Sequence, residues 1–277
     1  ARQAGLEVLR VLPEPVAAAS FYTGVLGRDV AVRQALAVVD FGGGTFDVAV
    51  LRRTAEGFTV AGAGGADDLG GLDLDAAVIA HLRAGPGLDE RAWARLDQPT
   101  TLADRRDRAA LWADARTAKE ILSRRTQASV QLPGAVAPTH LTRAEFEQLA
   151  APAIDRAVQL TARVLADAGV AAPAGSGPHP QLVGLFLVGG SSRIPLLGQR
   201  LHRALGFPPT VLEQPETAVA EGALRHVGTV APHVVAALDR MAAPPPSASG
   251  SAGGVAGVAG AAPERYSGDD ADPGAGA

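Results

Sequence analysis

The chain has 277 residues, of which 47% are hydrophobic and only 4% aromatic, and it contains no cysteine. It can therefore bury a core of small aliphatic side chains, and disulfides, thiolate nucleophiles and zinc–thiolate sites are excluded. The formal net charge of -4 at pH 7 argues against a polyanionic partner, so we expect no nucleic acid to bind.

No apolar run reaches the roughly 20 residues that cross a bilayer, so we expect no membrane segment in this sequence. The absence of cysteine fits a reducing compartment, and we expect a cytoplasmic protein. The first residue is Ala1 rather than Met, and we expect that further residues precede it.

Hydrophobic periodicity and glycine or proline breaks predict short strands and helices in the first third of the chain. In chain order these are a strand at 6–12, a buried Ala-rich helix at 16–22, a buried strand at 35–41, antiparallel strands at 46–51 and 58–61, and a helix at 72–82.

Residues 85–141 have a different character. A polar helical stretch carries Arg105, Arg106, Arg108, Arg116, Arg124 and Arg125, and a strand is predicted at 128–132. This pattern predicts a smaller inserted subdomain in which the arginines form a solvated helix face.

A long helix is predicted to begin at Thr142, because Glu145 three residues later completes a capping box, and Gly169 is expected to end it. A loop at 171–180, a strand at 182–188 and helices at 195–205 and 215–226 are predicted to follow. Residues 242–277 are rich in Pro, Ala, Gly and Ser, which predicts a disordered tail.

The strongest chemical motif is VVDFGGGTFD, from Val38 to Asp47. A strand brings Asp40 to its end, and the glycines at 42–44 let successive amides form a concave phosphate site. Asp40 and Asp47 suit Mg²⁺ held through its retained waters, and Thr45 places a hydroxyl at the lip. A plain glycine hairpin with surface aspartates explains this motif equally well when it is taken alone.

The second motif is LVGGSSRIP, from Leu187 to Pro195, where a strand again runs into glycines and a helix. Its small residues would let a base or ribose lie against the backbone, and the Arg193 guanidinium can stack on a purine. Taken alone, this motif is more simply a structural junction. If both motifs bind one nucleotide, the turns at Gly43 and Gly190 must share a crevice.

Together with segments 5–19, 69–75, 118–123 and 214–222, the two motifs resemble, in order, those of DnaK-type 70-kilodalton heat-shock chaperones over residues 1–230. The resemblance implies the second half, lobe II, of an α/β actin-like ATPase (ribonuclease H-like) domain from a bacterial, N-terminally truncated family member. It assigns 1–34 to the end of lobe I and the interlobe crossing, 35–71 and 145–230 to the nucleotide-binding core, and 72–144 to an inserted α+β subdomain.

The resemblance also implies ATP or ADP with Mg²⁺ as cofactors and assigns residues to them. Glu14 would order the metal's water shell or the attacking water, and Asp40 and Asp47 would lie on the magnesium side. The remaining contacts implied are Gly42, Gly43, Gly44 and Thr45 at the phosphates, and Lys119, Ser123, Gly189, Gly190, Ser191, Arg193 and Glu216 around the adenosine. Catalysis would therefore involve Glu14, Asp40, Thr45 and Asp47.

Client polypeptides, a J-domain co-chaperone and a nucleotide exchange factor are the partners that the resemblance implies. Arg116 and Glu120 stand where many family members have Glu and Arg, and residues 66–68 depart from the family's usual Asp-Thr-His. The family's first phosphate loop with its lysine, and its peptide-binding β-sandwich, are absent from the sequence. We therefore expect this chain alone to hydrolyse ATP poorly.

Two other classes of function stay open at this stage. Actin-like filament proteins of the cell-shape type share the Glu-Pro-x-Ala-Ala-Ala crossing and the glycine loop, although Thr45-Phe46-Asp47 and residues 189–195 favour the chaperone side. The other class is a nucleotide-sensing pseudo-ATPase scaffold, which would bind ATP without turning it over.

Overall fold

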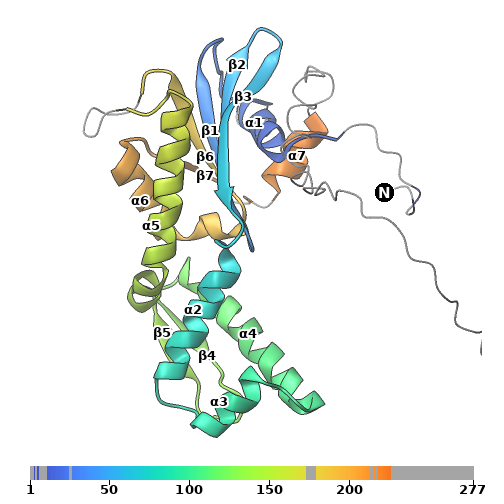
Figure 1. Ribbon diagram of the computed structural model, residues 1–277, viewed down its shortest axis with the longest axis vertical. Coiled ribbons are helices and arrows are strands. Elements are labelled where there is room, and N and C mark those ends of the chain that lie inside the picture. Colours follow the sequence, from blue (N-terminus) through green and yellow to red (C-terminus); the bar gives the residue numbers. More distant parts are fainter. Residues whose placement is uncertain are drawn as a thin grey trace, which may run out of the picture. The chain divides into compact units, whose positions relative to one another are not determined.

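A five-stranded mixed sheet organises the chain (Figure 1). The structure is a computed structural model that describes residues 3, 5, 11–24, 27–172, 179–212, 215 and 217–225. The strands are β1 (Ala35–Phe41), β2 (Phe46–Thr54), β3 (Gly57–Ala66), β6 (Leu182–Val188) and β7 (Thr210–Val211), in the order β3-β2-β1-β6-β7. β1, β2 and β3 are antiparallel neighbours, whereas β6 runs parallel to both β1 and β7.

Each face of this sheet buries a separate hydrophobic cluster, because successive side chains of a strand point to opposite faces. Ala37, Val39 and Phe41 belong to the cluster that also contains residues of α5 (Arg143–Asp167) and α6 (Pro195–Leu205). Leu36 and Val38 belong to the cluster formed with α1 (Glu14–Gly24) and α7 (Ala218–Arg225). Asp40 continues the second series, so this alternation places it on the α1 side of the sheet.

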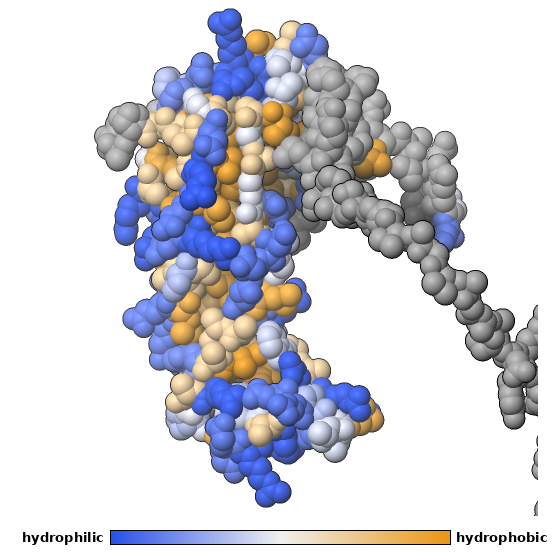
Figure 2. Space-filling model, in the orientation of Figure 1, coloured by the Kyte–Doolittle hydropathy of each residue, from blue (hydrophilic) through white to orange (hydrophobic). Residues whose placement is uncertain are grey.

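The remaining elements form the segment drawn below the sheet in Figure 1. They are α2 (Gly71–Ala84), α3 (Glu90–Asp97), α4 (Leu102–Leu122) and an antiparallel pair, β4 (Gln127–Val130) with β5 (Thr139–Thr142). Trp93, Leu111 and Leu141 are buried in this segment and join the same cluster as the α5 side of the sheet. The face shown in Figure 2 is mainly hydrophilic over α3, as its charged sequence leads one to expect.

The predicted helix start at Thr142 is confirmed in detail. Thr142 Oγ1 accepts a hydrogen bond from the amide of Glu145 (3.2 Å), and Glu145 Oε2 accepts one from the amide of Thr142 (2.8 Å). α5 ends at Asp167, and Gly169 then adopts a φ of +67°. The α5 helix is therefore specified at both ends by local sequence.

The predicted strands at 35–41 and 182–188 and the helix at 195–205 have the predicted bounds, whereas β3 is longer than expected. The predicted strand at 58–61 ended before the glycines at 62, 64 and 65. Of these, Gly64 makes room for α5, because a Cβ there would lie 2.9 Å from Val164 Cγ2. Residues 11 and 12 are not in a strand, and the rest of the predicted strand at 6–12 lies outside the described residues.

One further predicted element begins later than expected, and two others lie partly or wholly outside the described residues. α7 begins at Ala218 rather than at 215, and the predicted loop at 171–180 is described only in part. The predicted tail at 242–277 lies outside the described residues. No helix within the described ranges is both long and apolar enough to span a membrane.

Candidate nucleotide site

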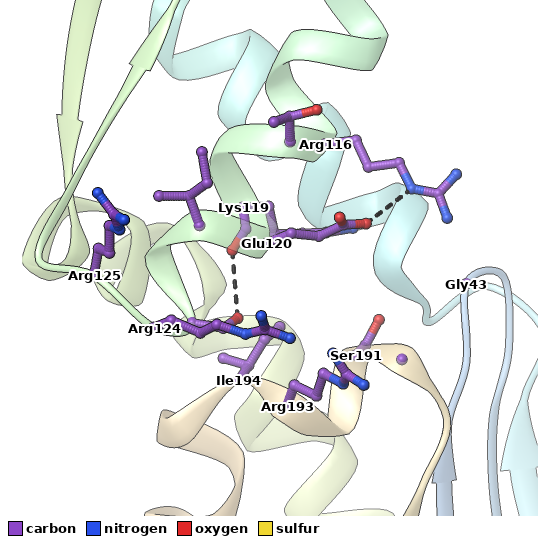
Figure 3. A pocket seen from close by; sticks show the side chains of 13 residues that line it. Gly43, Arg116, Lys119, Glu120, Arg124, Arg125, Ser191, Arg193 and Ile194 are labelled. Carbon is purple, nitrogen blue, oxygen red and sulfur yellow. Dashed lines mark hydrogen bonds and ion pairs between the residues drawn. The ribbon is translucent and has the colours of Figure 1, made fainter. Parts of the chain in front are cut away.

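The two glycine turns converge at one edge of the sheet, as the sequence predicted. β1 and β6 are parallel neighbours with Asp40 opposite Val188, so the turns that follow them emerge side by side. Ser191 Oγ donates a hydrogen bond to the Gly42 carbonyl (2.8 Å), which ties one turn to the other. Gly43 and Gly190 both line a cavity of about 730 Å³, which we call the basic cavity (Figure 3).

Gly43 and Gly44 face open space. A Cβ on either residue would meet no heavy atom within 4 Å, and neither residue has a positive φ, so the fold itself does not require glycine there. No hydrogen bond from their amides to another described residue is present. Exposed amides beside open space are the features that an anion-binding loop needs.

Gly70 and Gly71, in contrast, are required by close packing behind this loop. A Cβ on Gly70 would lie 2.6 Å from the Gly43 carbonyl oxygen, and one on Gly71 would lie 2.6 Å from Ser191 Oγ. The amide of Gly71 donates to the Gly42 carbonyl at 3.1 Å. The sequence had indicated only a break before a helix at this position.

The predicted adenosine contact Lys119 lines the basic cavity, but its charge is already neutralised. Its ammonium group lies 2.7 Å from Asp75 Oδ1 and donates to the Gly71 carbonyl at 2.7 Å. Both side chains of the ion pair are buried. Asp75 was part of the quoted 69–75 motif, yet no role had been assigned to it.

The other predicted adenosine residues are placed as follows. Ser123 lines the basic cavity, and its hydroxyl donates to the Lys119 carbonyl (3.4 Å). Arg193 lines the cavity too, from the short helix η2 (Gly190–Arg193). Glu216 lies outside the described residues.

Gly189 has a φ of +80°, and a Cβ there would collide with Asp40 Oδ1 and lie 2.6 Å from the Phe41 carbonyl oxygen. Its place in the fold is therefore one that only glycine fits without strain. The Asp40 carboxylate consequently packs against the second glycine turn.

The arginines predicted to be solvated are exposed at 105, 106, 116, 124 and 125, and the prediction fails only for Arg108, which is partly buried. Arg116, Arg124 and Arg125 line the basic cavity. Arg108 instead donates to the carbonyls of Leu96 and Asp97. Arg105, Arg106, Arg108 and Arg116 lie on α4, where side chains turn about 100° per residue, whereas Arg124 and Arg125 follow the end of this helix.

The predicted acidic residues line a different cavity, of about 660 Å³, which we call the acidic cavity. Glu14, Asp40 and Asp47 are joined there by Asp67, which the sequence analysis had noted only as a departure from the family pattern. Asp40 and Asp47 are direct partners across β1 and β2. Thr45 is exposed and lines neither cavity, so the expected single site is divided between two cavities.

Burial, and then the charges of Glu14 and Asp47, raise the pKa of Asp40 from its ordinary 3.8 to about 6. The described residues contain no group of three or more His, Asp or Glu side chains placed to hold a metal ion directly. Two facing carboxylates do suit Mg²⁺ held through its own waters, because this ion dehydrates reluctantly. The donor set therefore fits a water-mediated magnesium ion.

The mixed sheet and the paired glycine turns are those of an α/β protein of the actin-like fold class. The chain belongs to the Hsp70 protein family, whose model matches residues 1–238. The predicted family and fold class are thus confirmed, and the filament and pseudo-ATPase alternatives are not favoured.

The chain is also similar in sequence to curated chaperone proteins. The chain is 39% identical over 226 residues to the chaperone protein HscA homolog of Bordetella pertussis, 36% identical over 223 residues to chaperone protein HscA of Escherichia coli O17:K52:H18, and 37% identical over 223 residues to that of Klebsiella pneumoniae. These matches cover 80% of this chain but only 32–33% of each relative. The chain therefore spans about a third of the length of the curated relatives it matches.

Proposed function

We propose that this chain forms the second lobe of an ATP-binding and ATP-hydrolysing chaperone switch. The observation that carries the proposal is the convergence of Gly43 and Gly190 on one cavity, although their motifs lie far apart in the sequence. The volume of about 730 Å³ falls within the range of small-molecule and cofactor sites. The names of the curated relatives, all chaperones, favour the same function.

In this proposal the basic cavity holds the nucleoside and its first phosphates. The exposed amides of Gly43 and Gly44 donate to phosphate oxygens, and Thr45 adds a hydroxyl at the lip of the loop. Ser123, Gly190 and Arg193 surround the base and ribose. Lys119 contributes chiefly by fixing α4 to α2 through Asp75, which keeps the cavity wall in place.

The acidic cavity supplies the groups for hydrolysis. When bound through water, Mg²⁺ would neutralise charge on the transferred phosphoryl group. Asp40 and Asp47 would hold such an aqua ion by accepting hydrogen bonds from its waters, and Glu14 would orient the attacking water. Positioning and charge neutralisation supply most of the catalysis in this reaction class.

We further propose that residues 72–144 act as an inserted subdomain whose α4 wall closes on the nucleotide. Closure would be transmitted to client polypeptides, with a J-domain co-chaperone and a nucleotide exchange factor as regulators. A cytoplasmic location accords with the absence of cysteine. The chaperone names of the HscA relatives support this assignment of partners in general terms.

Gly43→Ala in the complete gene product tests the nucleotide site. The added methyl meets no protein atom, so the melting temperature should stay unchanged. ATP affinity, measured by calorimetry with Mg²⁺, should fall at least about tenfold, because the methyl group would occupy the open space beside the amide and keep the phosphate out of hydrogen-bonding reach, and one hydrogen bond to a charged group contributes about 1.5–3 kcal/mol.

Gly198→Ala in α6 is the matched control, because its new methyl would only touch Pro209 at 3.6 Å, an ordinary contact. That variant should bind ATP like the parent protein. Equal ATP affinity in the Gly43 and Gly198 variants would remove the first glycine turn from the site and with it the proposed function.

A further inference from the structure

The wall of the basic cavity that α4 and the following turn provide carries far more positive charge than a neutral nucleoside needs. Glu120 is the one acidic residue among the described residues that line this cavity. The cationic lining residues are Arg116, Lys119, Arg124, Arg125 and Arg193. This concentration of cations occurs in a chain whose formal net charge is -4.

Two of these cations already have acidic partners. Lys119 is paired with the buried Asp75 at 2.7 Å, and Arg116 with Glu120 at 3.3 Å. No ion pair within the described ranges joins the guanidinium of Arg124 or of Arg125 to an acid. These two side chains are also exposed.

Arg124 and Arg125 are not needed to cap the C-terminal end of α4 with their side chains. Arg143 Nε already donates to the Leu122 carbonyl at 2.8 Å. The Ile121 carbonyl accepts hydrogen bonds from the backbone amides of both arginines, at 2.9 and 2.8 Å. Stabilisation of the helix end therefore leaves both guanidinium groups available.

Figure 3 places these cations away from the phosphate turn. Gly43 lies at one side of the view and Arg125 at the other, with Arg124 and Arg193 between them. In the proposed function, the amides of Gly43 and Gly44 donate hydrogen bonds to one phosphate chain on the sheet side of the cavity. Arg124 and Arg125 come from the facing wall, so they suit a second anionic group of the same ligand.

We propose that the basic cavity accepts a nucleotide carrying an additional phosphate on its ribose, and that Arg124 and Arg125 bind that phosphate. This inference rests on the proposed nucleotide function. Guanidinium groups match phosphate oxygens in a bidentate fashion, which suits them to this task. Glu120, a carboxylate in the cavity lining, is already ion-paired with Arg116 at 3.3 Å.

The experiment compares ADP with its 3′-phosphorylated derivative in calorimetric titrations of the complete gene product. The parent protein should bind the 3′-phosphorylated form about tenfold more tightly at low salt, since two exposed charge pairs each contribute modestly. Raising the ionic strength should shrink the preference, because exposed charges are screened. The Arg124→Ala/Arg125→Ala variant should bind both nucleotides equally, with the ADP affinity of the parent.

Arg91→Ala/Arg106→Ala is the matched control. Both arginines are exposed in the same segment and neither lines the basic cavity, so this variant should keep the full preference. If ADP itself does not bind to the parent protein, the proposed function fails and this inference fails with it. If ADP binds but the additional phosphate brings no gain, this inference alone is overturned.

A third outcome is also decisive. Arg124 could instead stack on the base, as a guanidinium does on an aromatic ring. In that case Arg124→Ala would weaken ADP and its 3′-phosphorylated derivative by the same factor. Such a uniform loss would overturn the assignment of a second phosphate site.

Discussion

The basic and acidic cavities flank one pair of glycine turns but have opposite charge. Among the described residues, five cationic side chains and one carboxylate line the basic cavity, whereas four carboxylates and no cation line the acidic cavity. In the basic cavity Lys119 and Arg116 have acidic partners, while in the acidic cavity Glu14 and Asp47 repel the charge of Asp40. The first cavity is thus arranged for holding anions and the second for holding a cation or a proton.

One sheet thus presents the proposed nucleotide-binding groups in one cavity and the proposed catalytic groups in the other. Alternation along β1 places Asp40 on the α1 side, while the turn that follows the same strand places Gly43 in the basic cavity. Gly189 packs against Asp40 and Phe41, where a Cβ would collide with the Asp40 carboxylate. Substitutions in the two cavities should therefore have separable effects.

The largest expected effect belongs to the acidic cavity. Asp40→Ala in the complete gene product should lower ATP turnover by about a hundredfold or more, as loss of one preorganised electrostatic group does. ADP affinity should change little, because Asp40 does not line the basic cavity. Steady-state phosphate release and calorimetry measure the two quantities.

Asp68→Ala is the control for that experiment, because Asp68 lines neither cavity and is ion-paired with Arg156 at 2.7 Å. Its turnover should match that of the parent protein. If Asp40→Ala and Asp68→Ala had the same turnover, the acidic cavity would have no part in hydrolysis, and the functional contrast between the two cavities would disappear.

The next effect concerns the stability of the basic cavity's wall. Lys119 is the only lysine in the sequence, and it is buried against Asp75. Lys119→Met should lower the free energy of unfolding by about 3–5 kcal/mol, because it leaves a buried carboxylate without its partner. Adding Asp75→Asn should recover most of that loss, which urea unfolding of the chain would measure.

The double variant, Lys119→Met with Asp75→Asn, also distinguishes a structural role of Lys119 from a role in nucleotide binding. If it regains stability but still binds ATP weakly, Lys119 contacts the nucleotide as well as Asp75. A loss below about 1 kcal/mol for Lys119→Met alone would be typical of an exposed ion pair and would contradict the buried geometry.

Local sequence was enough to predict much of this fold and part of the site. The strands at 35–41 and 182–188 are short apolar runs closed by glycines, and the α5 capping box involves residues only three apart. The resemblance also identified Gly43, Gly190 and Arg193, which the structure brings to one cavity.

What the sequence could not supply depends on contacts between distant residues. Asp75 acquires its partner from another helix, and the close approach of Gly64 to Val164 exists only once α5 packs on β3. The division of the site into two cavities follows from which face each side chain of β1 occupies after pairing with β2 and β6. The exposure of Arg124 was predicted, but its place in the cavity wall depends on Gly190 and Arg193, which lie far from it in the sequence.

The smallest expected effect tests the electrostatic cost of the acidic cavity. Because the folded-state pKa of Asp40 is raised from 3.8 to about 6, its stabilising contribution is complete below pH 3.8 and is lost as the pH rises through about 6. Asn resembles the protonated carboxyl group, so Asp40→Asn should raise the melting temperature at pH 8 by about 3 °C. The gain should shrink at pH 5, where most of Asp40 is already protonated in the folded state.

Asp68→Asn provides the opposite case, because the hydrogen bond from Arg156 lowers the pKa of Asp68. Its charged form is favoured in the folded state, so this substitution should not raise the melting temperature at either pH. Thermal unfolding of the chain at pH 5 and pH 8 gives all four comparisons. A gain for Asp40→Asn that is equal at both pH values would point to packing rather than to charge, and it would contradict the cost of burying the Asp40 charge beside Glu14 and Asp47.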